Sequence, residues 1–483
     1  MNVKVIFNTL GRVSLAEAIF MLIPIAVSLI YAETAWFGFA VTAAIALGIG
    51  LLLCLCCRSK NNSIYAKEGF AIVALVWVLM SALGALPFVL NKEIPNYVDA
   101  LFETVSGFTT TGASLLTNVE AMSHGGLIWR SLTHWIGGMG VLVLVTAISP
   151  GSSNRTSYIL KAEMAGPIFG KLVPRLRDTA KILYLIYIVL TFIEIVLLKV
   201  FGMNWFESLF HALGTAGTGG FGMKGDSLAG YNPACQWIVA VFMLLFGINF
   251  NLFFLAIIRR FKAAFTGTEL RVYLIMIAVS TAIIAVNVYS FMASQGYSTG
   301  DTIRHSFFQV TSIVTTTGYS SVDYSAWPNL SKSLILVLTF IGGCAGSTAG
   351  GLKMSRAIIL FKMMGKELRR MLHPRSVAGV KLEGKRLDDT TTNNVGVYFS
   401  IYMVCILATF LLIGFEPFGI ETNLTAAVTC FNNVGPGFGA VGPAGSYADY
   451  SAFSKIVLSC SMLLGRLEVF PLLLALSPST WRR

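Results

Sequence analysis

The segment Asp99-Ala-Leu-Phe-Glu-Thr-Val-Ser-Gly-Phe-Thr-Thr-Thr-Gly112 lies between two apolar stretches, and it decides the fold that the sequence predicts. Its first part can form a helix of about three turns, opened by an Asp that suits a helix N-terminus. Such a helix is too short to cross a bilayer, and it ends in a Gly/Thr segment. The pattern is typical of a re-entrant hairpin, whose irregular backbone needs protein or a water-filled cavity around it at membrane depth.

The same hairpin occurs three more times. The later copies are Glu207-Ser-Leu-Phe210 with Gly217-Thr-Gly-Gly220, Asp301 with Thr315-Thr-Thr-Gly318, and Glu421-Thr-Asn-Leu with Val434-Gly-Pro-Gly437. One register aligns four glycines, spaced by 108, 98 and 119 residues: Gly112, Gly220, Gly318 and Gly437. Each repeat then consists, in order, of a membrane span, a short helix, a glycine-containing loop and a second span. A single loop of this kind is more simply a tight turn, but four in register favour a shared function.

The composition indicates that the chain folds in a lipid bilayer. Of 483 residues, 55% are hydrophobic and 12% are charged, about half the charged share of a soluble domain. The chain is therefore predicted to be an all-α polytopic membrane protein. Ten apolar segments are long enough to span: 15–32, 36–57, 69–90, 125–148, 180–201, 235–258, 272–293, 330–361, 395–415 and 451–476.

These spans divide the chain into five predicted units. An N-terminal helix pair occupies residues 1–66, and four pore repeats related by a pseudo-fourfold axis occupy 67–155, 156–265, 266–385 and 386–483. Most Lys and Arg residues fall in loops on the side of the two termini. Because cytoplasmic loops are enriched in these residues, both termini are predicted to be cytoplasmic and the hairpins to open to the outside. This topology explains the net charge of +12 without nucleic acid as a partner.

Four loops around one axis can build an ion filter. Their backbone carbonyls can replace the water shell of a dehydrated cation, and glycine lets the backbone approach the ion without a Cβ. The predicted filter residues are Thr110, Thr111, Gly112, Thr218, Gly219, Gly220, Thr316, Thr317, Gly318, Val434, Gly435, Pro436 and Gly437. Each short helix would also point its partly negative C-terminus toward the cavity below, which favours a cation.

Six stretches spread over the chain resemble the Trk/Ktr/HKT superfamily of potassium transporters, and the Trk-type membrane subunit most closely. They are Trp135-Ile-Gly-Gly-Met-Gly-Val141, Lys161-Ala-Glu-Met-Ala-Gly-Pro167, Arg177-Asp-Thr-Ala-Lys181, Gly346-Ser-Thr-Ala-Gly-Gly-Leu-Lys353, Asn433-Val-Gly-Pro-Gly437 and Gly465-Arg-Leu-Glu468. The extra N-terminal helix pair also looks like the Trk branch.

The resemblance implies a potassium-selective pore folded from one polypeptide, with K+ as the transported ion at the filter residues. It also implies a homodimer in the cell membrane and a cytosolic nucleotide-binding regulatory subunit that is TrkA-like. No cofactor is expected in this chain, which contains neither a Walker A nor a Rossmann fingerprint. In this superfamily a filter glycine in every unit accompanies potassium preference, and Gly112 fits that pattern.

The eighth span contains a candidate gate. The segment from Gly342 to Gly351 contains five glycines, which disfavour a helix, so we expect unwound backbone beneath the filter. The alternative is a helix whose small residues form a packing face, because it would have a similar composition. The resemblance implies a gate here, with a loop of Gly342, Gly343, Gly346, Ser347, Thr348, Gly350 and Gly351, and with Lys353 just after the loop and Arg466 in contact with it. Arg466, deep in the last span, is expected to be functional, and the resemblance implies that it forms an electrostatic barrier near the pore, below the filter. Lys353 either adds to this barrier or reaches toward the cytoplasm.

Other polar groups at membrane depth allow two interpretations. Hydrogen bonds that brace the hairpins are the simpler role, and a proton-coupling site is the alternative, for Glu103, Glu194, Glu207, His211 and His305. A proton- or sodium-coupled K+ symporter on the same scaffold therefore stays open beside a gated pore. An enzyme is disfavoured, because neither an HExxH nor a GxSxG pattern occurs.

Overall fold

The computed structural model describes residues 2–57, 66–140, 176–374 and 379–481, and these are almost entirely helical. Strands within the described ranges are limited to one antiparallel pair, β1 (Lys381–Leu382) and β2 (Lys385–Arg386). The chain begins with α1 (Val3–Phe20), α2 (Leu22–Ile30) and α3 (Trp36–Cys56). Together α1 and α2 form a longer apolar segment than the predicted span 15–32, because the helix already begins at Val3.

A unit of three helices then occurs four times. The long first helices are α4 (Ala66–Leu90), α9 (Leu176–Val200), α14 (Thr268–Ser294) and α18 (Asp389–Leu412). The short helices are α5 (Tyr97–Phe108), α10 (Trp205–Gly217), α15 (Thr299–Val314) and α19 (Ile420–Phe431). The second helices are α6 (His124–Gly138), α11 (Pro233–Phe246), α16 (Asn329–Ile341) and α20 (Ala452–Arg466). The all-α polytopic membrane fold is thus the architecture of the chain.

The second helices differ from the prediction of ten continuous spans. Two of the predicted spans are bent, by 92° between α11 and α12 (Phe250–Ile257) and by 120° between α20 and α21 (Phe470–Leu476). Span 330–361 breaks into α16 and α17 (Met354–Leu372). Helix α6 ends at Gly138, and residues 141–148 of its predicted span, like the predicted boundary at 155, lie outside the described residues.

The breaks have local causes. Asn249 has a non-helical backbone, and its side chain accepts a hydrogen bond from the Asn251 amide, so a new helix begins there. Val469 has a φ of +65°, which no right-handed helix can contain. The described residues also include smaller elements: η1 (Val119–Ala121), α13 (Phe261–Phe265), η3 (Tyr324–Ala326), η4 (Gly439–Val441) and α22 (Pro478–Trp481).

Polar caps start three of the short helices. Asn96 caps α5, whereas Asn204 with Glu207, and Ser298 with Asp301, form capping boxes on α10 and α15. Hydrogen bonds from Ser298 and from Arg304 lower the pKa of the Asp301 carboxyl to about 2, so this cap is ionised at neutral pH. Asp99 therefore lies in the first turn of α5 and not at its cap, and it pairs with Lys455 at 2.8 Å.

The helices pack in a closed cycle. The second helix of each repeat contacts the short helix of the next repeat: α6 contacts α10, α11 contacts α15, α16 contacts α19, and α20 returns to α5. Large side chains such as Phe102, Phe108 and Trp129 are fully buried between these helices. In contrast, Val286 and Leu411 on the first helices are 79% and 74% exposed. An apolar surface of this kind is suited to lipid.

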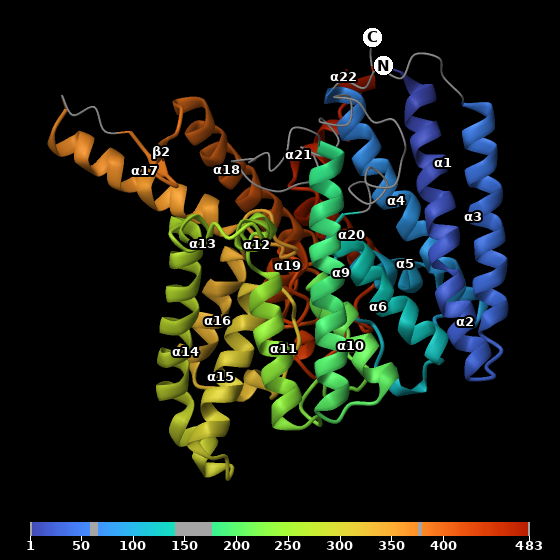
Figure 1. Ribbon diagram of the computed structural model, residues 1–483, viewed down its shortest axis with the longest axis horizontal. Helices are drawn as coiled ribbons and strands as arrows, with labels where there is room; N and C mark the ends of the chain where they lie inside the picture. Colours follow the sequence, from blue (N-terminus) through green and yellow to red (C-terminus); the bar gives the residue numbers. More distant parts are fainter. Residues whose placement is uncertain (1, 58–65, 141–175, 375–378, 482–483) are drawn as a thin grey trace.

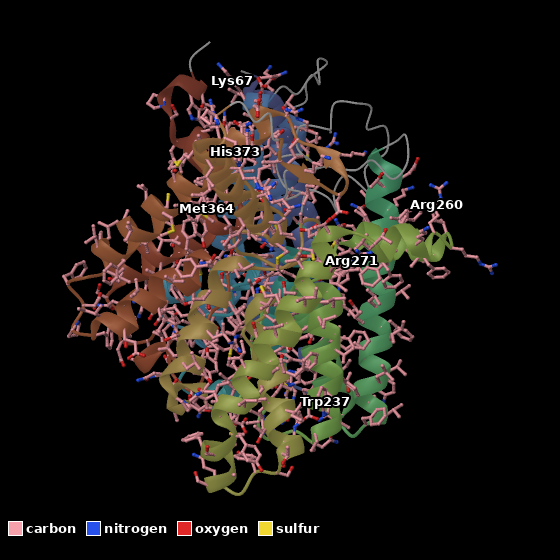
Figure 2. All side chains as sticks on the ribbon, turned by 90° about the vertical axis from the view of Figure 1, so that its left-hand side faces the viewer. Lys67, Trp237, Arg260, Arg271, Met364 and His373 are labelled. Carbon is pink, nitrogen blue, oxygen red and sulfur yellow. The ribbon has the colours of Figure 1, made fainter. Side chains whose placement is uncertain are left out.

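Figure 1 shows both chain termini at one end of the molecule, with α1 and α3 at the edge opposite α14 and α16. Helix α17 projects away from the helical body near the end where the termini lie. In the turned view of Figure 2, Lys67, Arg260 and His373 lie toward this end, whereas Trp237 lies toward the other.

The close contact between α20 and α19 makes one glycine testable. A Cβ at Gly465 would overlap the carbonyl oxygen of Phe431, whereas a Cβ at Gly365, on α17, would meet open space. We therefore expect Gly465→Ala to destabilise the protein by about 1–3 kcal/mol, and Gly365→Ala to be neutral or to stabilise it by up to about 1 kcal/mol, because alanine favours a helix more than glycine. Thermal unfolding of the detergent-purified variants measures the difference. Equal melting temperatures would contradict the packing described here.

Candidate functional site

The segments after the four short helices form a closed ring. A Cβ at Gly112 would overlap the carbonyl oxygen of Gly219. The same relation joins Gly220 to the carbonyl of Thr317, Gly318 to that of Val434, and Gly435 to that of Thr111. Each glycine thus lies against the residue that precedes the glycine of the next repeat, and the fourth repeat closes on the first. Only a residue without a side chain fits at these four positions.

The backbone of the four segments has one shared conformation. The residue two before each glycine has a positive φ of 54° to 56°, and these residues are Thr110, Thr218, Thr316 and Asn433. The glycines follow with φ of 76° to 91°. An alternation between left-handed and ordinary backbone turns successive carbonyl groups toward the same side of a segment, as an ion-binding ring requires.

The fourth segment corrects the predicted register. Its ring glycine is Gly435 and not Gly437, so the last spacing is 435 − 318 = 117 residues. The Gly437 amide instead donates a hydrogen bond to the Val441 carbonyl at 2.7 Å, and its Cα packs against Thr425 of α19. Pro436 remains at the ring, where its Cδ lies beside Gly318.

The sequence reasoning missed two residues at the ring, Asn433 within the fourth segment and Tyr447 beyond it. Asn433 takes the position of Thr110, and its Nδ2 donates to the Thr111 hydroxyl and to the Met462 carbonyl, both at 3.0 Å. Tyr447 donates from its hydroxyl to the Gly435 carbonyl at 2.8 Å. One signal could have found the register, because Phe431 precedes Gly435 by four residues as Phe108 precedes Gly112.

A cavity of about 200 Å³ lies on one side of the ring, and its lining includes all four ring glycines. This is more than ten times the space that a single water needs. Arg130 also lines the cavity, but Glu103 pairs with its guanidinium at 2.8 Å and both side chains are buried. The pairing offsets a positive charge that would otherwise repel cations from the ring.

The glycine-rich loop between α16 and α17 lies against the ring segments. The Gly350 amide donates to the Thr316 hydroxyl at 2.6 Å, and the Gly350 Cα lies beside the Asn432 carbonyl. Gly342, Gly346 and Gly351 have φ near +75°, so this segment is an irregular loop and not a small-residue helix face. Further hydrogen bonds join Cys344 to the Gly247 carbonyl and the Thr348 hydroxyl to that of Phe246.

Arg466 connects three parts of the structure. Its Nη1 donates to the Thr348 carbonyl of the glycine-rich loop at 2.9 Å. Its Nη2 donates to the carbonyls of Gly137 and Gly138, at the end of α6, at 2.6 and 2.7 Å. As expected from their spacing, Arg466 does not pair with Glu468, which forms a bidentate ion pair with Arg356.

A second, smaller cavity of about 60 Å³ lies among these groups. Gly138, Gly346, Ser347, Gly350, Gly351, Lys353 and Arg466 belong to its lining. Lys353 is only 4% exposed, and its Nζ donates to the Ala349 carbonyl, so this side chain stays inside instead of reaching the solvent. Two cationic side chains, Lys353 and Arg466, thus line this small cavity together with the glycine-rich loop.

The five polar residues that the sequence analysis placed at membrane depth differ in their contacts: three have hydrogen-bond or ion-pair partners that brace the structure, and two are fully buried. Glu103 pairs with Arg130, Glu207 caps α10, and His305 bonds to the Ser321 hydroxyl at 2.8 Å, which are bracing contacts. Glu194 of α9 and His211 of α10 are fully buried. Among the described residues, no cluster of His, Cys, Asp and Glu side chains could hold a metal ion.

Comparison with known proteins covers the whole chain. Residues 37–482 match the family model TrkH, described as a cation transport protein. The Trk system potassium uptake protein TrkH of Escherichia coli is 36% identical, and TrkG of the same organism is 32% identical, each over essentially both full lengths. The crystal structure of the potassium transporter TrkH from Vibrio parahaemolyticus has a TM-score of 0.89, with 31% identity and complete coverage of both chains.

The corrected register gives a direct test of the ring. Because an Ala methyl at position 435 would collide with the Thr111 and Gly112 backbone at a φ of +91°, we expect Gly435→Ala to reduce cation selectivity at least tenfold. Gly437→Ala would press on Thr425 of α19 and on Val441, and it should lower stability without changing selectivity. Competition between K+ and Na+ for uptake into cells measures both. A selectivity loss confined to Gly437→Ala would restore the register predicted from the sequence.

Proposed function

The chain belongs to the TrkH family of cation transport proteins, and we propose that it is the membrane subunit of a potassium uptake system. In this proposal K+ crosses the cell membrane through a gated, K+-selective pore within the single chain. The observation that carries the proposal is the cyclic packing of the four ring segments, in which each glycine lies against a carbonyl of the next repeat. The names of the relatives support potassium as the ion.

The physical task of such a ring is to replace water. A dehydrated monovalent cation loses its hydration shell, and carbonyl oxygens arranged around it supply the missing coordination. In the proposed filter these oxygens come from four segments: Thr110 to Gly112, Thr218 to Gly220, Thr316 to Gly318, and Asn433 to Gly435. The cavity above would hold the hydrated ion before it enters.

The glycine-rich loop is the proposed gate. It contacts Thr316 of the filter on one side and Arg466 on the other, so it lies between the filter and the α6 and α20 ends. The cationic side chains of Arg466, which is partly buried, and of Lys353, which is buried, would raise the energy of K+ beside the loop. Opening then requires the hydrogen bond between Arg466 and the Thr348 carbonyl of the loop to break.

A coupled symporter is the second candidate. It is favoured by the burial of Glu194 and His211 around the second short helix, because buried titratable groups can carry protons. Both candidates share the same ring, and they differ in whether K+ flux responds to a proton or sodium gradient.

The proposal includes partners and orientation. A homodimer and a cytosolic, TrkA-like nucleotide-binding subunit are proposed because the relatives are named as parts of a Trk system. Both termini are proposed to be cytoplasmic, with the filter open to the outside. The common end of the two termini in Figure 1 and the basic residues near that end in Figure 2 support this orientation.

We expect Gly112→Ser to let sodium permeate more readily. The side chain would meet the Gly219 carbonyl and disturb the ring that K+ requires. A roughly tenfold fall in the K+/Na+ flux ratio in proteoliposomes is expected. Unchanged selectivity with intact K+ flux would contradict the filter assignment.

We expect Arg466→Ala to raise basal K+ flux several-fold, because the change removes both the barrier charge and the contacts that hold the Thr348 carbonyl. Arg271→Ala, which changes an exposed arginine at the start of α14, is the matched control and should leave flux unchanged. The readout is tracer flux in proteoliposomes at equal protein content. A fall in flux with intact protein would overturn the gating role.

The proposed function itself is tested by flux of K+, Rb+ and Na+ into proteoliposomes, with and without a pH gradient. A gated pore predicts K+ and Rb+ flux that follows the K+ gradient and is unchanged when the pH gradient is collapsed. Flux that stops without the proton or sodium gradient would favour the symporter, and flux of neither K+ nor Rb+ would refute both.

A further inference from the structure

The second ring segment lacks the pair of hydrogen-bonded threonines found in the first and third. Thr109 and Thr111 in the first segment, and Thr315 and Thr317 in the third, form side-chain hydrogen bonds of 2.8 Å between their hydroxyls. Each pair ties the end of a short helix to the ring. In the second segment the corresponding positions are Gly217 and Gly219, which have no side chains to form this tie.

An imidazole from another repeat occupies the vacant space. His134 of α6 is fully buried, and a Cβ at Gly219 would overlap its ring atoms Cγ, Nδ1 and Cδ2. The His134 ring also packs on Phe221, with 4.2 Å between the ring centroids. Gly219 is therefore a glycine for a reason specific to the second segment, which is the presence of this side chain behind it.

The two nitrogens of His134 bind two different repeats. Nδ1 lies 2.8 Å from the Gly107 carbonyl, which can only accept, so Nδ1 carries the proton. Nε2 accepts a hydrogen bond from the Phe221 amide at 3.3 Å. A single neutral imidazole therefore connects the end of α5 in the first repeat to the backbone just after the second ring glycine, Gly220.

Arg130 adds to the same face of α6, four residues earlier. Its guanidinium lies 4.1 Å from the centroid of the Phe221 ring, and its Nη1 donates to the Gly222 carbonyl at 3.4 Å. Residues four apart share one face of a helix. The backbone from Gly219 to Gly222 thus rests on a surface made by Arg130 and His134.

We propose that His134 is a selectivity-positioning residue, which takes the place of the missing threonine pair and holds the second filter segment in the ring. This inference rests on the proposed potassium filter. It explains why the second segment departs from the Thr-Thr-Gly pattern while its glycine keeps the same backbone conformation as the others. His134 contacts no ion in this role, and it acts through the Gly219–Phe221 backbone.

The test combines four variants in proteoliposomes, with the Rb+/Na+ uptake ratio as the readout. His134→Ala removes both hydrogen bonds and should lower the ratio about tenfold. His134→Gln, whose amide can donate and accept, should keep most of the ratio. Gly219→Thr alone should be as damaging as His134→Ala, because its side chain collides with the imidazole. The double variant Gly219→Thr/His134→Ala should recover selectivity relative to Gly219→Thr, since the hydroxyl side chain then has room.

Two controls separate the possible failures. His124→Ala changes a histidine on the same helix that pairs with Glu33 away from the ring, and it should leave the ratio unchanged. A wild-type protein without selective flux would refute the proposed function. Selective wild-type protein with an unchanged ratio in folded His134→Ala would refute only the positioning role, as would a double variant no better than Gly219→Thr. Melting temperatures of all variants identify loss of folding.

Discussion

The contact on which the structure depends is the close approach of each ring glycine to a carbonyl oxygen of the next repeat. A Cβ at any of the four positions would push neighbouring segments apart, and the ring would no longer close. The constraint extends outward, because Gly137 and Gly465 let the ends of α6 and α20 reach the carbonyls of Phe108 and Phe431. The short helices can therefore lie directly behind the ring. The four repeats of one chain thus pack into a single closed ring.

Charge in the interior follows a second constraint, which is that a buried ion needs a partner. Glu103 pairs with Arg130 beside the larger cavity, and Glu468, which lines the smaller cavity, pairs with Arg356. Arg466 is held by backbone carbonyls of Thr348, Gly137 and Gly138. These contacts place the Arg466 guanidinium beside the glycine-rich loop.

Several features were predictable from residues alone because their causes are local. The short helices follow from apolar segments too brief to span, and the unwinding after Ile341 follows from the glycine content of the next ten residues. The bend between α11 and α12 was missed, since Asn249 in an apolar stretch gives a weak signal until its side chain is seen to cap a new helix. The fourth register was missed for a related reason. Gly435 and Gly437 are equally plausible turn glycines, and only packing against Thr111 or Thr425 distinguishes them.

The sequence by itself determined the membrane environment, the fourfold repetition and the family. Hydrophobicity, repeat spacing and motifs are all visible in the order of the residues and do not depend on tertiary contacts. The tertiary structure alone decided which atoms of different repeats meet. Contacts such as Asn433 with Thr111, Arg466 with Gly137, and His134 with Phe221 join residues tens to hundreds of positions apart. Their geometry depends on how helices cross in three dimensions, and no local pattern encodes a crossing between elements so distant in the chain.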